Sequence, residues 1–312
     1  MKKLLLSFVL TFIGLLKSFA CLNGETTVLK DGTYLYTDRR EKVPYGHRYE
    51  VDNKSLNKSL KKLDGLYKST KDLDYLSDKG LVLILLKKYD EAIKLYLEIE
   101  KKEPNRYSTA SNIGTAYELA GQNENALRWI KRAVEIDPTS HDNSEWLHVK
   151  ILEAKIKGEQ YYNSDFLLNL RFGSGDEPVS GLKDTALLHL HDALYYQLNE
   201  RVSFIKTKDE LVAELLFDLG NAAFELGHYN DAIHDYDRAR LYGYVGDLID
   251  ARVALAERLE KGETVGTPKE VKVIEIKKDN KAGRGKASFI IVVIIIGLFA
   301  PLVLYLKRVN RD

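Results

Sequence analysis

Cysteine is nearly missing from this chain of 312 residues, because Cys21 is the only one. A single cysteine excludes an internal disulfide, so the fold must be held by packing. An excess of one charge is missing too, since 47 Lys and Arg residues are balanced by 46 Asp and Glu residues. Proteins that bind nucleic acid depend on clustered Lys and Arg, so this balance argues against a nucleic-acid partner.

Motifs of catalysis are missing as well. The chain has no Gly-x-Ser-x-Gly elbow, no Gly-x-x-x-x-Gly-Lys loop and no His-Glu-x-x-His pair. His189 and His191 lie two residues apart, which points them to different faces of a helix and suits a metal ion poorly. We therefore predict no catalytic residue, metal ion, cofactor or small-molecule substrate, and we predict that the chain is not an enzyme. The alternative is a metal-binding or hydrolytic protein that uses its histidine clusters and residues 160–181.

Two long apolar runs lie near the ends of the chain. At the N-terminus, two lysines precede residues 4–16, an apolar run too short to span a bilayer, and the small residues Ser18 and Ala20 follow. This layout is typical of a secretory signal peptide that is cleaved after Ala20. Cys21 would then be the first residue. Ala20 fits a lipoprotein signal and Ser18 does not, so a doubly anchored envelope lipoprotein with lipidated Cys21 stays open as an alternative.

The second run, residues 287–306, is uncharged and has the length that a transmembrane helix needs. Lys307 and Arg308 follow it directly, and a basic flank favours the cytoplasmic side of a membrane. Together with an exported N-terminus, these features predict a single-pass protein of the bacterial inner membrane. Its repeat domain would lie in the periplasm and residues 307–312 in the cytoplasm. Residues 262–286 are charged and contain glycine, as expected of a linker.

An internal repeat of 34 residues is the most informative pattern between the two ends. The positions that recur are Gly80, Ala92 and Pro104 in one copy and Gly114, Ala126 and Pro138 in the next. Gly220 and Ala232 repeat the spacing of the glycine and the alanine further along the chain. A pair of antiparallel helices of this length cannot bury its apolar face alone, so the units must stack into an α-solenoid.

The predicted fold is all-α, with a short N-terminal hairpin that β-prone residues on both sides of Asp31-Gly32 indicate. Because a two-stranded hairpin is marginal in water, it must pack on the first helices. The predicted segments are a signal peptide 1–20, an N-terminal extension 21–47, a helical solenoid 48–261 with clear repeats 73–106, 107–140 and 211–244 and an insertion 160–181, a linker 262–286, a transmembrane helix 287–306 and a tail 307–312.

The recurring glycine, alanine and proline positions resemble the tetratricopeptide repeat (TPR). The resemblance implies a concave groove, lined by the first helix of each unit, that binds a protein or peptide partner. One TPR subclass grips a C-terminal carboxylate with Lys, Asn and Arg side chains. The matching positions in this chain hold Ser77, Leu81, Asn112, Asp142 and Trp146. Only Asn112 fits, so a carboxylate clamp is not expected.

The remaining groove positions define the predicted partner site. They are Ser108, Ser111, Thr115, Glu118, Asp142 and Glu145. This set is polar and mildly acidic, which favours a basic or neutral peptide. We therefore predict a membrane-tethered extracytoplasmic TPR scaffold that takes part in the assembly or maintenance of an envelope complex. Its partner would be a protein or peptide of the cell envelope.

Overall fold

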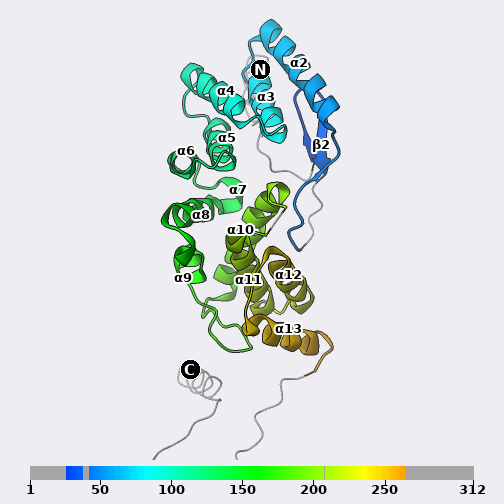
Figure 1. Ribbon diagram of the computed structural model, residues 1–312, viewed down its shortest axis with the longest axis vertical. Coiled ribbons are helices and arrows are strands. Elements are labelled where there is room, and N and C mark those ends of the chain that lie inside the picture. The colour runs from blue at the N-terminus through cyan, green and yellow to red at the C-terminus, as the bar shows by residue number, and fades with distance from the viewer. Residues whose placement is uncertain (1–25, 38–41, 207, 264–312) are drawn as a thin grey trace, which may run out of the picture. The chain divides into compact units, whose positions relative to one another are not determined.

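The computed structural model describes residues 26–37, 42–206 and 208–263, and these are mostly helical (Figure 1). The predicted signal peptide, Cys21, the transmembrane segment 287–306 and the tail 307–312 lie outside these residues. The linker 262–286 also lies outside them, apart from its first two residues. None of the helices that the structure describes has the length and apolar character needed to cross a membrane.

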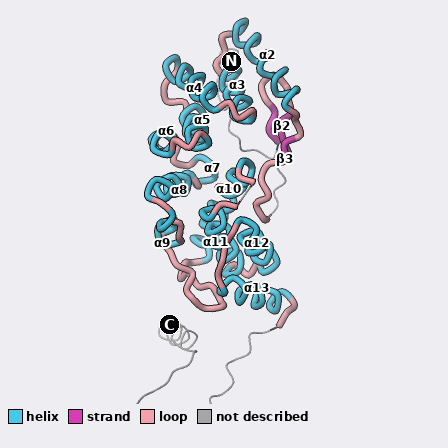
Figure 2. The backbone as a smooth tube through the Cα atoms, viewed as in Figure 1, coloured by secondary structure: helices cyan, strands magenta, loops and turns pink. Residues whose placement is uncertain are grey.

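Three short strands precede a series of helices. In chain order, the elements are β1 (Thr26–Val28), β2 (Tyr34–Thr37), β3 (Arg48–Tyr49), α2 (Asn53–Thr70), α3 (Asp74–Leu85), α4 (Tyr89–Lys102), α5 (Tyr107–Leu119), α6 (Asn123–Ile136), α7 (Ser140–Asn143), α8 (Glu145–Lys157), the 3-10 helix η2 (Glu159–Tyr161), α9 (Ser164–Leu168), α10 (Asp184–Phe204), α11 (Glu210–Glu225), α12 (Tyr229–Tyr242) and α13 (Asp247–Glu260). Figure 2 shows how short most of the connecting loops are, with the coil after α9 as the main exception.

The predicted hairpin is present and carries a third strand. β1 and β2 are antiparallel and are joined by the turn at Asp31-Gly32, and β3 pairs with the other edge of β2. Leu35 on β2 is fully buried, in one cluster with Leu56 and Leu63 of α2. The small sheet is therefore stabilised by packing on the first helices, as expected for strands too few to be stable alone.

The 34-residue repeat reflects a close contact inside each helix pair, α3 with α4, α5 with α6, and α11 with α12. A Cβ atom on Gly80 would lie only 2.4 Å from Tyr96 Cζ, and one on Gly220 only 2.6 Å from Tyr236 Cδ1. Gly114 has the same close contact with the second helix of its pair. Glycine recurs because a large side chain of the second helix fills the space directly above the backbone of the first.

The predicted insertion 160–181 is more ordered than a simple loop. It contains most of η2 and all of α9, and Leu167 of α9 is fully buried. The coil after α9 is held by Arg252 of α13, whose guanidinium donates hydrogen bonds to the carbonyl oxygens of Phe172, Gly173 and Gly175 at 3.2, 2.8 and 3.2 Å. The insertion is thus packed against the last helices of the solenoid.

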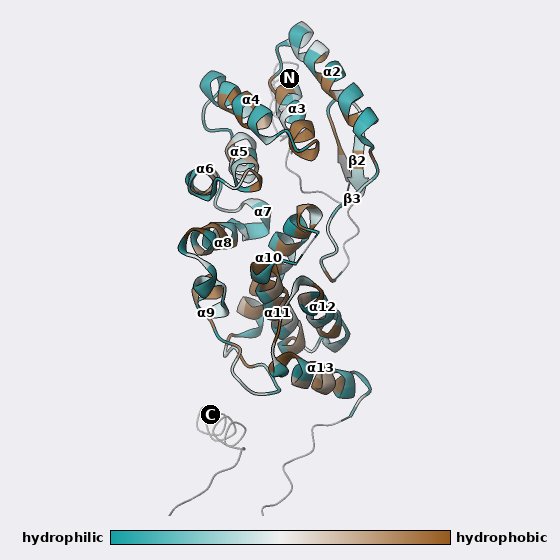
Figure 3. Cartoon of the chain, in the orientation of Figure 1, coloured by the Kyte–Doolittle hydropathy of each residue, from teal (hydrophilic) through white to brown (hydrophobic). Residues whose placement is uncertain are grey.

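Between the insertion and the last clear repeat lies one long helix, α10, which spans Asp184–Phe204. It packs on α11 with Leu194, Leu198 and Val202 fully buried. Figure 3 shows that α11 is largely apolar, that α10 carries both apolar and hydrophilic residues, and that hydrophilic residues run along α2. α10 is therefore a core element of the second half of the solenoid.

The chain just before β3 holds the C-terminal end of α10. The Gly46 N–H donates a hydrogen bond to Asn199 Oδ1 at 2.8 Å, and the His47 N–H donates to Ser203 Oγ at 2.7 Å. His47 Nε2 also lies 2.9 Å from a carboxylate oxygen of Glu200. These contacts connect the N-terminal sheet to α10, and they fix the end of α10 that lies opposite α5.

Candidate partner-binding site

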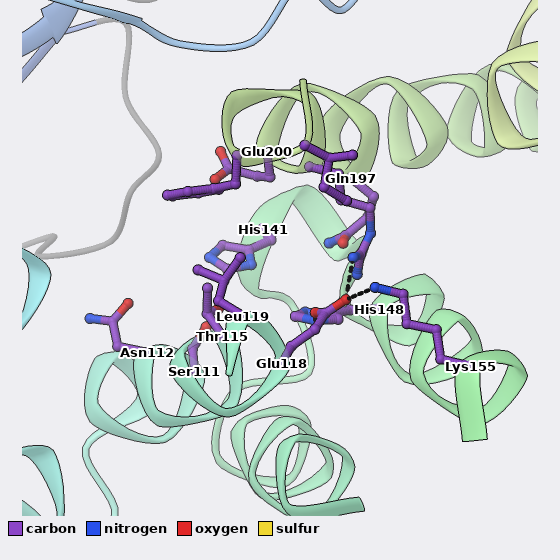
Figure 4. Close-up of a pocket in the computed structure, with 13 residues that line it drawn as sticks. Ser111, Asn112, Thr115, Glu118, Leu119, His141, His148, Lys155, Gln197 and Glu200 are labelled. Atoms are coloured by element: carbon purple, nitrogen blue, oxygen red, sulfur yellow. Dashed lines mark hydrogen bonds and ion pairs between the residues drawn. The ribbon is translucent and has the colours of Figure 1, made fainter. Parts of the chain in front are cut away.

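A cavity of about 230 Å³ lies between α5, α8 and α10, on the face of α5 where the partner groove was predicted (Figure 4). Its lining residues are Ser111, Asn112, Thr115, Glu118 and Leu119 of α5, His141 of α7, His148 and Lys155 of α8, and Gln197, Glu200, Arg201, Phe204 and Ile205 in or directly after α10. On α5 the spacing of Ser111, Thr115 and Glu118 places these side chains on one helix face.

Glu118 is the electrostatic centre of the cavity. Its side chain is only 8% exposed, and its carboxylate accepts hydrogen bonds from Lys155 Nζ at 2.7 Å and Arg201 Nη1 at 2.6 Å. His148 Nε2 lies 2.7 Å from the other carboxylate oxygen. Burial opposes ionisation, but the charges of Arg201, Lys155 and His148 outweigh it and hold the pKa of Glu118 well below its ordinary value. The ionised carboxylate therefore joins α5 to α8 and α10.

A second buried carboxylate, that of Glu145 on α8, lies directly behind the cavity. It is 1% exposed, forms an ion pair with His141, and has one oxygen 3.4 Å from His148 Nδ1. The hydroxyl groups of Tyr107 and Ser111 donate to its other oxygen at 3.0 and 3.5 Å. Burial favours the neutral acid, but the hydrogen bonds with His141 and His148 outweigh it, so the pKa of Glu145 is lowered.

His148 connects the two buried carboxylates. Burial favours the neutral imidazole, yet the charge of Glu118 and the hydrogen bonds with both glutamates raise the pKa of His148 above its ordinary value. Each ring nitrogen faces a carboxylate oxygen, so the ring serves this network and not a metal ion. Within residues 26–37, 42–206 and 208–263, no group of three or more His, Cys, Asp or Glu side chains could hold a metal ion.

The short turn α7 has an unusual backbone. His141, Asp142 and Asn143 have φ angles of 51°, 54° and 61°, in the left-handed region. This region costs a residue such as His141 roughly 1–2 kcal/mol, whereas Asp and Asn enter it more readily. The turn brings the His141 ring beside Tyr196 of α10, with ring centroids 5.4 Å apart. It also directs His141 into the cavity, while Asp142 lies outside it.

The structure brings together four of the six residues predicted for the groove. The four that line the cavity or lie directly behind it are Ser111, Thr115, Glu118 and Glu145. The other two do not line it: Ser108 is half-buried, and Asp142 lines a neighbouring hollow instead. The predicted set therefore does not form a single surface.

Sequence reasoning missed the cations of the cavity. Lys155 and Arg201 bind the carboxylate that was predicted to make the groove mildly acidic, and they balance its charge together with His148. His148 and Lys155 lie seven residues apart, two turns along one face of α8, and this spacing was a signal that could have been read. Arg201 had no such signal, because α10 lies outside the clear repeats.

Two parts of the chain match models of the tetratricopeptide repeat, residues 77–141 and residues 213–242. The chain contains tetratricopeptide repeats. The first match covers the helix pairs that carry Gly80 and Gly114, and the second covers the pair that carries Gly220. Repeats of this kind generally serve as scaffolds that mediate protein–protein interactions. No model of a catalytic family matches the chain, and no curated protein matches it.

Several solved TPR structures are similar to this chain. TTC0263, a thermophilic TPR protein of Thermus thermophilus, is 16% identical with a TM-score of 0.34, covering 65% of this chain and 91% of that one. A TPR protein of Parabacteroides merdae is 15% identical with a TM-score of 0.32, covering 66% and 94%. The TPR2AB domain of yeast Sti1, solved as a complex with pHSP90, is 14% identical with a TM-score of 0.31, covering 67% and 79%.

Proposed function

We propose that the chain is a membrane-tethered TPR scaffold whose helical part lies in the periplasm. There it would hold a protein of the cell envelope during the assembly or maintenance of an envelope complex. The membrane placement draws on two features of the sequence, the signal-like residues 1–20 and the uncharged apolar run 287–306. The basic residues directly after that run favour the cytoplasmic side of a bacterial inner membrane for the short tail.

The cavity between α5, α8 and α10 is the observation that carries the scaffold proposal. It combines apolar side chains, Leu119 and Phe204, with polar groups, which is the mixture that fixes a bound peptide in one orientation. Asn112 is 4% exposed, and its Nδ2 has no hydrogen-bond partner among the described residues. A carbonyl oxygen of a bound segment would satisfy this donor. The charges of the cavity are already paired, so a neutral segment fits it.

A substitution that fills the cavity tests the scaffold proposal. Thr115→Arg would place a long side chain in a space of about 230 Å³ without removing any member of the Glu118 network. Thr70→Arg, at an exposed position of α2, is the matched control. Each full-length chain is captured from solubilised envelope membranes, and the retained proteins are identified. We expect one defined envelope protein to be retained by the native chain and the control and lost with Thr115→Arg.

Two results would contradict parts of this proposal separately. A native chain that retains no envelope protein would exclude the scaffold role. Retention that is unchanged with Thr115→Arg would keep the scaffold role but exclude this cavity as the site. Protease protection tests the placement in the same cells: digestion of the helical part from the cytoplasmic side only would rule out the periplasm.

A further inference from the structure

A second hollow, of about 510 Å³, lies along the first half of α10, whereas the Glu118 cavity lies along its second half. Its walls come from α7 and α8, from the end of α9 with the coil that follows, and from α10. The large apolar side chains that line it are Trp146, Leu168, Leu170, Leu182, Leu188 and Leu190. We name this surface, as defined by these six residues, the tryptophan groove.

The apolar surface of the tryptophan groove is open to solvent. Trp146 is 40% exposed and Leu188 is 44% exposed, and the other four leucines are half-buried. Single exposed apolar residues are ordinary, but here two exposed side chains share one concave surface with four leucines that are partly buried against the core. A continuous exposed apolar surface with polar residues at its rim marks a site of interaction with another protein.

The charged groups at the rim of this groove are acidic. Asp142 and Asp192 line it, and no lysine or arginine of the described residues does. Asp142 is exposed and forms no ion pair with a described residue. Asp192 pairs only with His191 within this part of the chain, at 3.3 Å. In contrast to Glu118, these carboxylates have no strong cation beside them, so complementarity favours a partner that supplies Lys or Arg.

The tryptophan groove is built by the part of the sequence that breaks the repeat. Leu168 and Leu170 belong to the insertion, and Leu182 directly follows it. Asp142 and Trp146 occupy positions where TPR chains present groove residues, and residues of the insertion line the same hollow. The left-handed turn keeps Asp142 at the rim of this groove, outside the Glu118 cavity. The interruption of the repeat thus creates an apolar surface that regular helix pairs would not form.

We propose that the tryptophan groove docks a peptide segment of a partner protein in which leucine-like side chains alternate with Lys or Arg. The apolar side chains would cover Trp146 and Leu188, and the cations would approach Asp142 and Asp192. This inference rests on the proposed role as a protein-binding scaffold and names the chemistry of the segment that is held. It does not depend on which side of a membrane the chain lies.

Three short labelled peptides of one design test the proposal on the full-length chain. The first alternates lysine pairs with leucine pairs, the second has glutamate in place of lysine, and the third has serine in place of leucine. Fluorescence anisotropy measures the affinity of each peptide. Trp146 is one of only two tryptophans, so in a Trp129→Phe background its emission reports binding at this groove. We expect the lysine–leucine peptide to bind at least about tenfold more tightly than the other two and to shift that emission to the blue.

Single substitutions locate the binding. Leu188→Ser should weaken binding of the lysine–leucine peptide about tenfold. Asp142→Asn should weaken it by roughly two- to fivefold, and asparagine tolerates the left-handed backbone at this position. Leu241→Ser is the matched control, because Leu241 is 71% exposed on α12 and lies outside the groove. Its affinity should match that of the native chain.

The results that overturn the groove proposal differ from those that overturn the scaffold. A lysine–leucine peptide that does not bind, or binds equally well to the Leu188→Ser chain, excludes the groove, even if the chain retains an envelope protein. If the glutamate peptide binds as tightly as the lysine–leucine peptide, the partner segment does not need the positive charge that we assign to it. If sedimentation shows a native dimer that Leu188→Ser converts to a monomer, a second copy covers the groove and the proposal is wrong. If the lysine–leucine peptide binds but the chain retains no envelope protein, the groove proposal is supported and the scaffold role is excluded.

Discussion

Glu118 and Asp218 are buried carboxyl groups on the first helix of a helix pair, α5 in one half of the solenoid and α11 in the other. Glu118 has three cationic groups within 2.7 Å. Asp218 accepts a hydrogen bond from the Ser164 hydroxyl at 2.8 Å and forms no ion pair within the described residues. Burial, together with the neighbouring charge of Glu214, raises the pKa of Asp218 well above its ordinary value. Repeats that pack alike thus lower the pKa of one buried carboxyl and raise that of the other.

The difference depends on where the buried cations point. Arg252 is 1% exposed and lies near Asp218, yet it donates to Asn221 Oδ1 at 2.6 Å and to carbonyl oxygens of the coil after α9. Asp235 of α12 is in the same situation as Asp218. It is fully buried, neither of its oxygens has a hydrogen-bond partner in the described part of the chain, and burial raises its pKa. The partners that the tertiary fold brings to a buried carboxyl therefore set the direction in which its pKa shifts.

Removal of the charge at Glu118 should have the largest effect. Glu118→Gln leaves Arg201 and Lys155 buried without their carboxylate, and breaking a buried ion pair in this way costs about 3–5 kcal/mol. Because the pKa of Glu118 is lowered in the folded chain, this stability is present at neutral pH and is lost as the pH falls through the folded pKa. Urea unfolding at pH 7 and pH 3 measures the difference between the native and variant chains, which should shrink at pH 3.

Glu124→Gln is the control for this substitution, because Glu124 is exposed on α6. Its free energy of unfolding should stay within about 0.5 kcal/mol of the native value. A Glu118→Gln chain that unfolds as the control does would mean that the three cations do not need this carboxylate. The contrast between the two halves would then disappear.

The packing of the two halves should prove equal, although the pKa values of their buried carboxyls shift in opposite directions. Gly114→Ala would place a Cβ atom 2.4 Å from Ile130 Cδ1, and Gly220→Ala would place one 2.6 Å from Tyr236 Cδ1. Overpacking of this kind costs about 1–3 kcal/mol, and we expect it in both halves. Gly65→Ala is the matched control, since nothing lies within 4 Å of the added atom and alanine favours a helix by roughly 0.5–1 kcal/mol. Thermal unfolding measures the melting temperature of the three variants. A lower value for both Gly114→Ala and Gly220→Ala than for Gly65→Ala means that both halves need the close contact, and a lower value for only one limits the need to that half.

The shared packing could be predicted from the sequence, and the buried charges could not. Gly80, Gly114 and Gly220 recur at fixed spacing because a local contact inside each helix pair demands them, so the period reveals the fold directly. The short hairpin was also visible, from the turn residues Asp31-Gly32. Such features involve residues that are close in sequence, and a single chain displays them.

The candidate site was only partly predictable for the opposite reason. The helix face of Ser111, Thr115 and Glu118 follows from helical spacing. The Glu118–Arg201 contact, however, joins residues 83 positions apart, and no repeat relates α5 to α10. The path of α10 depends on the insertion before it and on the segment that ends at His47. A contact that depends on the tertiary structure, such as this one, is not repeated at a fixed spacing in the sequence.

The neutral carboxyl of the second half should respond in the opposite direction to Glu118. Because its pKa is raised, Asp218 binds a proton more tightly in the folded chain than in the unfolded chain, where the ordinary pKa is roughly 3.9. Stability is therefore lost as the pH rises from that value toward the raised folded pKa. Asp218→Asn keeps an oxygen for the Ser164 hydroxyl and removes this loss. We expect it to raise the free energy of unfolding by on the order of 1 kcal/mol at pH 7 and to change nothing at pH 3.

Urea unfolding between pH 3 and pH 7 measures the free energy of unfolding of the Asp218→Asn chain, and the Asp231→Asn chain serves as the comparison. Asp231 is half-buried at the start of α12, and its side chain is 13% exposed beside Lys42. If only Asp218→Asn raises the free energy of unfolding at neutral pH, the raised pKa of Asp218 is supported. A loss at neutral pH would mean that Asp218 is ionised and that Arg252 stabilises it after all.

The smallest effect is expected at an ion pair of the first half that lies outside the cavity. Lys131 Nζ lies 2.8 Å from Glu153 Oε1, a distance similar to those around Glu118, but the lysine is 50% exposed. Exposed pairs contribute only about 0.2–1 kcal/mol, so Lys131→Ala should lower the free energy of unfolding by no more than that. Salt distinguishes the two kinds of pair, because at 1 M the screening length is only ~3 Å and mainly exposed charges are screened. At high salt, Lys131→Ala should no longer change the free energy of unfolding, whereas Glu118→Gln should still lower it. If neither substitution changes the free energy of unfolding at high salt, burial does not protect the Glu118 network.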